Sequence, residues 1–365
     1  MAGADRQGLL LMNLGTPDAP TVAAVRRYLR EFLSDPRVID VHPVARWLLL
    51  NFIILVFRPP KSVKQYQSIW EERGSPLLLR SLEFTQKLAL ELQGDFEVEL
   101  GMRYGRPSLE EALARLRAKK IRSLTLMPLY PQYAASSTAS SLEKAYRLIG
   151  EAWDVLPIQV VPPFFDQPGF LDALAAVAAP VIRRGRADHV LFSFHGLPER
   201  HIHKSDSTGA HCLASPQCCD QLTAVNSNCY RAQAYYTARE AARRLGIPAQ
   251  GFSVSFQSRL GRTPWIRPYT DLWVQQLAQR GVRRLAVLCP AFVADCLETL
   301  EEIGIRARES FRSSGGEDLI LVPCLNDHST WIRAAAELAR TAMRSSRGQE
   351  ISNRLIASAA PTVGV

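Results

Sequence analysis

The sequence predicts an α/β protein built from two similar domains, each a parallel sheet flanked by helices, with the functional site in the cleft between them. Short apolar runs of strand length alternate with amphipathic segments of helical length. A turn-rich junction, Pro162-Pro163 followed by Asp166 to Gly169, divides this alternation into two series. The length of 365 residues also suits two domains of ordinary size.

The first series predicts an N-terminal domain over residues 1–165. It opens with an apolar strand at 8–14, which ends at Gly15-Thr16-Pro17, and a helix follows at 21–33. We expect further strands at 98–104, 123–129 and 158–161, and further helices at 84–92, 109–119 and 141–149.

The second series predicts a C-terminal domain over residues 166–344. Its expected strands are 189–194, 251–256, 284–289 and 319–322, and its expected helices are 170–183, 219–245, 272–280, 295–306 and 327–344. A cysteine-rich insertion at 203–230 interrupts the series. Residues 345–365 are rich in Ser, Arg and Ala, and we expect a flexible tail there.

The composition is that of a core-forming globular protein, with 47% hydrophobic and 22% charged residues. The net charge of +9 favours anionic partners, but no dense basic tract is interleaved with aromatic residues, so nucleic acid is not an expected partner. The chain opens without a signal-peptide pattern, and we expect a cytoplasmic protein.

Residues 43–80 break the alternation with an apolar segment. The run 47–57 is well short of the ~20 residues that span a bilayer. Arg58, Lys61 and Lys64 follow it at once. One interpretation is peripheral contact of 47–61 with an anionic membrane surface, the inner face of the cell membrane; the other is a buried core helix. We call residues 47–57 the apolar lip.

His195 follows directly on the expected strand 189–194. Ligands bind just past the carboxyl ends of strands in parallel sheets, and imidazole side chains titrate near physiological pH. The pattern therefore favours either a catalytic acid or base, or a histidine that caps its loop by hydrogen bonding.

Asp295, Glu298 and Glu302 share one face of the helix expected at 295–306, with Asp295 as its N-cap. Carboxylates in one stripe can bind a divalent cation or relay protons, although charged stripes are often only solvated faces. Ser136 and Thr138 follow another strand and suit either an anion or a helix cap. Arg103, at a third strand end, suits a carboxylate or an ordinary surface anchor.

Four of the seven cysteines lie within eighteen residues in the pattern C-x5-C-C-x9-C. In a chain without an export signal, such clustering favours a metal or iron–sulfur site over disulfides. Structural zinc bound by three of these cysteines with His211 or His203, and unligated thiols, remain alternatives. The clustered residues are Cys212, Cys218, Cys219 and Cys229, whereas Cys289, Cys296 and Cys324 are expected to pack in the core.

Several stretches together resemble the ferrochelatase family, in the family's order, from about residue 7 to 343. They are Asn13-Leu-Gly-Thr-Pro17, Gly74-Ser-Pro76, Tyr130-Pro-Gln-Tyr133 with Ser136 to Ser140, Ser193-Phe-His-Gly-Leu-Pro198, Pro264-Trp265, Asp295-Cys-Leu-Glu-Thr-Leu300 and Val322-Pro-Cys-Leu-Asn-Asp327. The resemblance implies insertion of Fe²⁺ into protoporphyrin IX, the last step of haem synthesis, in a cleft between two Rossmann-like domains.

The resemblance also implies roles for individual residues. His195 and Glu298 match the family's catalytic pair, and with Asp295 and Glu302 on the acidic path they form the expected metal set. The expected substrate-binding residues are Asn13, Arg103, Tyr130, Ser136, Thr138 and Trp265. Asn13 favours protoporphyrin, because coproporphyrin-using relatives commonly carry Tyr there.

The cysteines depart from the family's animal members, which hold a [2Fe–2S] cluster through one Cys in the tyrosine–serine loop and three near the C-terminus. Here Ala135 stands in that loop and no Cys follows Cys324. The insertion instead resembles that of some bacterial members, which implies a [2Fe–2S] cluster on Cys212, Cys218, Cys219 and Cys229.

Two other functions remain open at this point. One is a chelatase for another metal or another tetrapyrrole, such as coproporphyrin III, and the other is a non-enzymatic haem or iron–sulfur sensor. The presence of both His195 and Glu298 argues against the sensor, which needs neither a base nor a metal route. The sequence leaves open whether the chain forms a homodimer.

Overall fold

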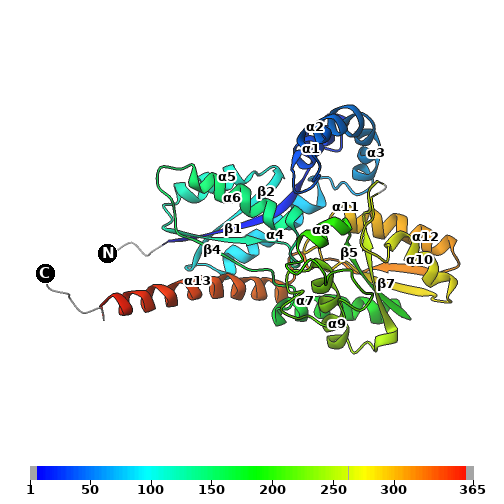
Figure 1. The fold of residues 1–365 in the computed structure, drawn as a ribbon. Coiled ribbons are helices and arrows are strands. Elements are labelled where there is room, and N and C mark those ends of the chain that lie inside the picture. The colour runs from blue at the N-terminus through cyan, green and yellow to red at the C-terminus, as the bar shows by residue number, and fades with distance from the viewer. Residues whose placement is uncertain (1–5, 262, 359–365) are drawn as a thin grey trace.

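The computed structural model describes residues 6–261 and 263–358, the last fourteen of these by their backbone alone. It contains two lobes side by side, each with a four-stranded, fully parallel sheet between helices (Figure 1). The predicted α/β class, with two similar parallel sheets, is confirmed. We call the lobes the N-lobe and the C-lobe.

The N-lobe is formed by the first half of the chain. Its strands are β1 (Gln7–Thr16), β2 (Phe96–Gly105), β3 (Ser123–Pro128) and β4 (Ile158–Val160). Its helices are α1 (Val22–Ser34), α2 (Pro43–Leu48), α3 (Leu55–Gln67), α4 (Pro76–Glu91), α5 (Leu109–Ala118) and α6 (Ser140–Gly150), with π-helical turns η1 (Leu49–Ile54) and η2 (Ala135–Ala139).

The C-lobe repeats the arrangement. Its strands are β5 (His189–His195), β6 (Phe252–Gln257), β7 (Arg284–Leu288) and β8 (Asp318–Leu321). Its helices are α7 (Pro168–Gly185), α8 (Glu199–Lys204), α9 (Tyr230–Arg244), α10 (Thr270–Gln279), α11 (Leu297–Leu300), α12 (Arg308–Ser313) and α13 (Ser329–Ser358), with the short turn η3 (Ala249–Gly251) and the π-helical turn η4 (Glu302–Ala307).

Both sheets have the same topology. The strand orders are β2-β1-β3-β4 and β6-β5-β7-β8, so the order reverses between β1 and β3 in one lobe and between β5 and β7 in the other. In open parallel sheets, the crevice at this reversal is where ligands bind. The loops after β1, β3, β5 and β7 are therefore the ones to search for a site.

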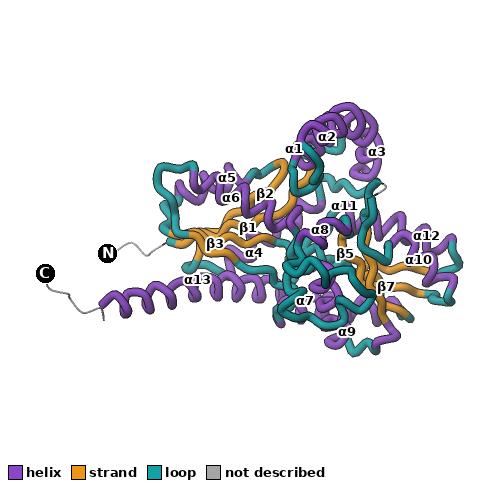
Figure 2. The backbone as a smooth tube through the Cα atoms, in the orientation of Figure 1, coloured by secondary structure: helices purple, strands orange, loops and turns teal. Residues whose placement is uncertain are grey.

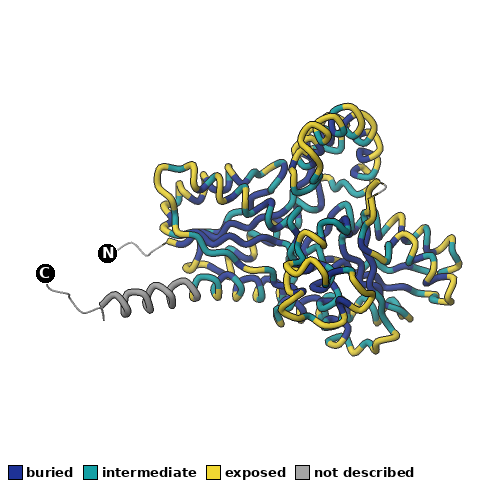
Figure 3. Tube along the Cα trace, viewed as in Figure 1, coloured by how far each residue is buried: buried dark blue, intermediate teal, exposed yellow. Residues whose placement is uncertain are grey.

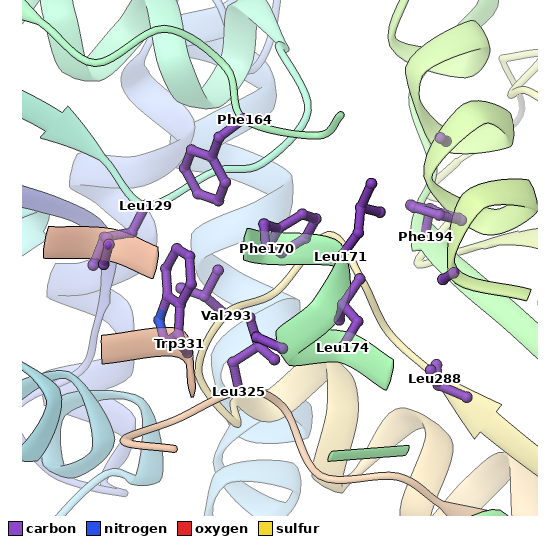
Figure 4. Close-up of a cluster of buried hydrophobic side chains, with 14 of the residues drawn as sticks. Leu129, Phe164, Phe170, Leu171, Leu174, Phe194, Leu288, Val293, Leu325 and Trp331 are labelled. Carbon is purple, nitrogen blue, oxygen red and sulfur yellow. The ribbon is translucent and has the colours of Figure 1, made fainter. Parts of the chain in front are cut away.

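The lobes share one hydrophobic core. Trp331 of α13 is fully buried, stacks on Phe84 of the N-lobe with ring centroids 5.7 Å apart, and contacts Phe170 of α7. Figure 4 shows this tryptophan among Leu129, Phe164, Phe170 and Val293, which come from both halves of the chain. The strands are buried inside both lobes, and exposed residues lie mainly on helices and loops (Figure 3).

The helix expected at 219–245 begins only at Tyr230, and residues 219–229 belong to a loop between α8 and α9 (Figure 2). Asn226 holds this loop, because its side-chain oxygen accepts a hydrogen bond from the N–H of Thr223 and its side-chain nitrogen donates to the carbonyl of Cys218. Asn side chains of this kind compete with helix formation. The expectation of a helix from Cys219 was therefore wrong at its start.

The helix expected from Asp295 begins at Leu297, with Cys296 as its N-cap. Asp295 precedes the helix because its carboxylate accepts hydrogen bonds from the N–H of Cys324 and from the side chain of Asn326 instead. At the C-terminus, α13 continues to Ser358, through most of the segment expected to be a flexible tail. Residues 359–365 lie outside the described part of the chain.

The apolar lip lies within an almost continuous helical stretch, formed by α2, η1 and α3, that projects from the N-lobe (Figure 1). Trp47, Phe52 and Phe57 are 58%, 61% and 66% exposed, so the lip is not the buried core helix that one interpretation required. Among the described residues, Pro43–Gln67 is the one helical stretch that is long and apolar enough to cross a membrane by length and composition. Within its most apolar 18 residues, 17% are buried.

Candidate active site

A cavity of about 1000 Å³ lies between the lobes at the carboxyl ends of the strands. The end of β1 and the loops after β3, β5 and β7 all contribute to it, as the strand orders indicate. The apolar lip closes it from the N-lobe side through Leu49 and Ile54. Its volume lies at the upper end of the range for small-molecule sites.

The end of β1 supplies the N-lobe wall. Gly15 has a φ of +110°, and a Cβ there would lie 1.7 Å from the carbonyl oxygen of Tyr104, so only glycine allows the strand to bend into the cavity here. Asn13 also lines the cavity, and its side-chain nitrogen donates to the hydroxyl of Ser81 at 3.1 Å.

The end of β5 carries His195 into the cavity from the C-lobe. Its Nδ1 lies 2.6 Å from the carbonyl oxygen of Gly196. Because a carbonyl oxygen can only accept, Nδ1 carries the proton, and Nε2 of the neutral ring keeps its lone pair. This is the tautomer that a general base requires.

Three glutamates enter the cavity wall: Glu298 from α11, Glu302 from η4, and Glu301 from the position between these two elements. Glu302 accepts hydrogen bonds from the N–H of Ser258, at 2.8 Å, and from its hydroxyl; burial nevertheless raises the pKa of Glu302. Glu301 is ion-paired with Arg306 at 2.8 Å. Glu298 lies close to α3 of the N-lobe. The pKa of Tyr66 in α3 is raised first by the burial of Tyr66 and then by the negative charge of Glu298.

Aromatic and hydroxyl side chains complete the cavity. Trp265 lies with its ring centroid 6.4 Å from that of His195. The hydroxyl of Tyr130 lies within hydrogen-bonding distance, 3.1 Å, of that of Ser141, and burial raises its pKa. Ser136 lines the cavity beside it.

Three residues of the expected site are not among the residues that line the cavity: Arg103, Thr138 and Asp295. Arg103 instead donates to Asp35 at 2.6 Å and to the hydroxyl of Ser140 at 2.8 Å. Although burial raises the pKa of Asp35, hydrogen bonds from Ser140, Arg37, Tyr104 and Arg103 lower it overall. Arg103 is thus paired with a buried carboxylate of its own lobe.

The cavity also contains residues that the sequence analysis did not select, chiefly Arg58, Gln65 and Tyr66 of α3. Arg58 is half-buried, and burial lowers its pKa, although the nearby Tyr66 and Glu298 oppose this effect. These residues follow the lip rather than a strand, so the search at strand ends missed them. The cations that follow the apolar run were the available signal.

The four clustered cysteines are buried free thiols in the loop before α9. The sulfurs of Cys218 and Cys219 are 3.6 Å apart, and Cys229 interacts through side-chain hydrogen bonds with both Cys219 and Cys212. The bond from Cys219 lowers the pKa of Cys229 to about 6. Among the described residues, no group of three or more His, Cys, Asp or Glu side chains is arranged to hold a metal ion.

Comparison with a family model and comparison with individual proteins both find similarity to one family. A sequence model of the ferrochelatase family matches residues 6–343. A ferrochelatase of Stutzerimonas stutzeri (strain A1501) is 50% identical over 337 residues, covering 92% of this chain and 98% of the relative. A ferrochelatase of Legionella pneumophila (strain Paris) is 48% identical over 329 residues, covering 90% of this chain and 97% of the relative.

The fold is similar to that of a solved chelatase. The structure of SirB from Bacillus subtilis with Fe³⁺ superposes with a TM-score of 0.54 and 10% sequence identity, covering 94% of this chain and 98% of SirB. At this identity the likeness concerns the fold alone.

Proposed function

The chain belongs to the ferrochelatase family, and we propose that it inserts Fe²⁺ into protoporphyrin IX, giving protohaem and releasing two protons. As a member of this family it is a porphyrin metal chelatase, a lyase of haem biosynthesis. The observation that supports the proposed reaction most directly is that His195, at the end of β5, and Glu298, in α11, line one cavity.

Metallation replaces two pyrrole N–H protons by Fe²⁺, so a base must face the ring. Nε2 of His195 accepts a proton, since Nδ1 is held by Gly196. Glu298 and Glu302 lie on the same wall, where they can pass protons to solvent and offer oxygen ligands to the arriving cation. Asp295, which lies behind this wall, keeps the loop before Glu298 in place through Asn326.

The remaining residues suit a flat tetrapyrrole with carboxylate side chains. Leu14, Leu49, Ile54 and Trp265 give the cavity apolar faces. Arg58 places a partly desolvated cation where a propionate can pair with it. Asn13, Tyr130 and Ser136 offer polar contacts at the rim of the ring. Arg103 binds Ser140, which follows the turn η2 that carries Ser136 and Thr138.

The proposal includes a [2Fe–2S] cluster on Cys212, Cys218, Cys219 and Cys229. The four cysteines suit such a group by residue type and burial, and the lowered pKa of Cys229 gives it the thiolate character of a ligand; the described thiols are not already arranged as a metal site, so binding would draw them together. Arg231 donates to the sulfur of Cys219 at 3.1 Å and would partly neutralise the negative charge of this sulfur as a cluster ligand. When bound, the cluster would supply a one-electron redox centre and would hold the four cysteines of the loop together as its ligands.

The apolar lip rests on an anionic membrane surface, from which a sparingly soluble porphyrin enters the cavity. This part of the proposal is supported by the exposed lip, by the cations that follow it, and by the cavity residues Leu49, Ile54 and Arg58 of the same helical stretch. The site of action is then the inner face of the cell membrane.

The test is an anaerobic assay of the purified protein with Fe²⁺ and protoporphyrin IX, with coproporphyrin III in parallel. We expect rapid loss of the free-porphyrin bands with protoporphyrin and no metallation by His195→Ala. Preference for coproporphyrin III would contradict the proposal that protoporphyrin IX is the substrate. If neither porphyrin were metallated, the proposed reaction would be wrong.

The absorption spectrum of the protein as isolated tests the cluster in the same cuvette. We expect visible charge-transfer bands that Cys218→Ser abolishes and that Cys324→Ser, at a buried cysteine outside the loop, leaves in place. A colourless wild-type protein, or an unchanged spectrum in Cys218→Ser, would contradict the cluster.

A further inference from the structure

Tyr230 is the first residue of α9, and its hydroxyl donates a hydrogen bond to the carbonyl oxygen of His195 at 2.8 Å. The same peptide unit is held at its other end, because the N–H of Gly196 donates to the carbonyl oxygen of Gln257 at 2.8 Å. The His195–Gly196 peptide is therefore fixed from two separate elements, α9 and β6.

This peptide needs such anchors. A Cβ on Gly196 would lie 2.8 Å from the carbonyl oxygen of Gln257, so the close approach to β6 requires glycine. Glycine restricts its own backbone rotation least. The carbonyl of Gly196 is also the acceptor that fixes Nδ1 of His195. Any rotation at this point moves the imidazole and alters the tautomer that leaves Nε2 free.

The anchor in α9 is tied in turn to the cysteine-rich loop. Cys229, the N-cap of α9, interacts with Cys219 and Cys212, and Arg231 donates to the sulfur of Cys219. Cys229 and Arg231, the neighbours of Tyr230 in the chain, therefore both contact sulfurs of the cysteine-rich loop. One turn later, the side chain of Gln233 accepts from the N–H of Tyr133 at 2.7 Å, so α9 also contacts the loop after β3.

We infer that Tyr230 is a positioning residue for His195 and that it transmits the state of the cysteine-rich loop to this histidine. The inference rests on the proposed role of His195 as the base. When the four sulfurs are drawn together, the first turn of α9 is held and the Tyr230 hydroxyl stays on the His195 carbonyl. When the sulfurs separate, Tyr230 withdraws and the imidazole loses its fixed orientation.

The first test compares Tyr230→Phe with Tyr236→Phe. Tyr236 lies on the same helix, packs edge-on against Phe165, and is not among the residues that line the cavity. We expect Tyr230→Phe to lower kcat about tenfold, about 1.4 kcal/mol of activation free energy, with KM for the porphyrin unchanged. Tyr236→Phe should stay within about twofold of the wild type. A rise in KM with unchanged kcat would show that Tyr230 only contacts substrate, and would overturn the inference.

The tautomer gives a readout independent of turnover. In protein labelled with ¹⁵N-histidine, the long-range ¹H–¹⁵N spectrum of His195, assigned with His195→Ala, should show a protonated Nδ1 in the wild type and in Tyr236→Phe. Tyr230→Phe should show a mixture of tautomers. An unchanged His195 signal in Tyr230→Phe would contradict the positioning role.

A double-mutant cycle tests the link to the cysteines. Cys229→Ser should lower kcat in the wild type but have little further effect in Tyr230→Phe, because the loop acts through the tyrosine. Additive losses would contradict the link. Cys219→Ser serves as the second variant if Cys229→Ser does not fold. If His195→Ala retains full activity, the proposed base is wrong, whereas the histidine spectrum still decides whether Tyr230 positions this ring.

Discussion

Two neighbouring glutamates in the cavity wall experience opposite environments. Glu301 is bound on both oxygens by Arg306, at 2.8 and 2.9 Å, so its negative charge is compensated. Glu302 accepts only from Ser258 in the described contacts, and burial raises its pKa. The uncompensated carboxylate is the one suited to accept and release a proton during turnover.

The raised pKa predicts an unusual result for Glu302→Gln. Because the folded state binds this proton more tightly than the unfolded chain, the free energy of unfolding falls as pH rises through the folded pKa. The variant lacks this loss of stability, so its stability relative to the wild type should increase as the pH rises above about 4.3, the ordinary pKa of a glutamate. Its metallation rate should fall roughly tenfold or more, as for loss of a proton-transfer group. Urea unfolding and the anaerobic assay measure the two effects.

The matched change is Glu301→Gln, which should have the opposite effect on stability. It leaves Arg306 without its carboxylate and should cost about 1 kcal/mol, because the guanidinium is half exposed and solvent recovers part of the loss. If Glu301→Gln also gained stability relative to the wild type, the proposed difference between the two environments would be wrong.

At the scale of residues, the sequence predicted the C-lobe side of the cavity better than the N-lobe side. His195 and Glu298 follow strands at the topological reversal, where a position in the chain implies a position at the crevice. Arg58 follows the lip in α3, and its position relative to the cavity does not depend on a strand. Arg103 does stand near a strand end, but its side chain is drawn to Asp35, a partner distant in sequence.

At the scale of elements, strand positions could be read from the sequence and helix starts often could not. A buried strand can be recognised in the sequence as an apolar run. The start of a helix depends instead on which side chains accept hydrogen bonds from its first N–H groups. The loop before α9 illustrates this, because Asn226 and the clustered cysteines keep residues 219–229 out of the helix. Those contacts cannot be predicted from the periodicity of apolar residues in the sequence.

The exposed lip predicts membrane binding that depends on particular side chains. Phe52→Ser and Phe57→Ser should each weaken binding to anionic vesicles about tenfold, because each removes a large apolar group that would enter the acyl boundary. Co-sedimentation with vesicles containing phosphatidylserine measures the effect. Raising the salt concentration should weaken binding further, since the exposed Lys61 and Lys64 follow the lip.

The control for the lip is Trp153→Ser, which removes an almost fully exposed aromatic side chain elsewhere on the N-lobe. It should bind vesicles like the wild type. Equal binding by all four proteins would contradict the membrane proposal. Loss of a dimer in size-exclusion chromatography on Phe52→Ser, without vesicle binding by the wild type, would instead assign the lip to contact between two copies.

At the scale of the whole molecule, the alternation of strands and helices predicted two sheets but not how they are joined. The helix α13 follows the last strand of the C-lobe, yet its residues pack on α4 of the N-lobe as well as on α7. Helical periodicity shows that α13 has an apolar face and does not show which sheet that face covers. The cavity depends on this helix, because the two lobes that form its walls are held together by the shared core.

The shared core predicts that the lobes unfold together. Trp331→Ala should lower the free energy of unfolding by about 3–5 kcal/mol, the cost of a large aromatic cavity, in one cooperative transition. Trp331→Phe keeps a ring against Phe84 and should cost about 1 kcal/mol. Hydrogen exchange of β1 and β5 under mild denaturant reports the lobes separately. If one sheet lost its protection well before the other, the lobes would be independent, and the cavity between them would be held by its ligand rather than by the core.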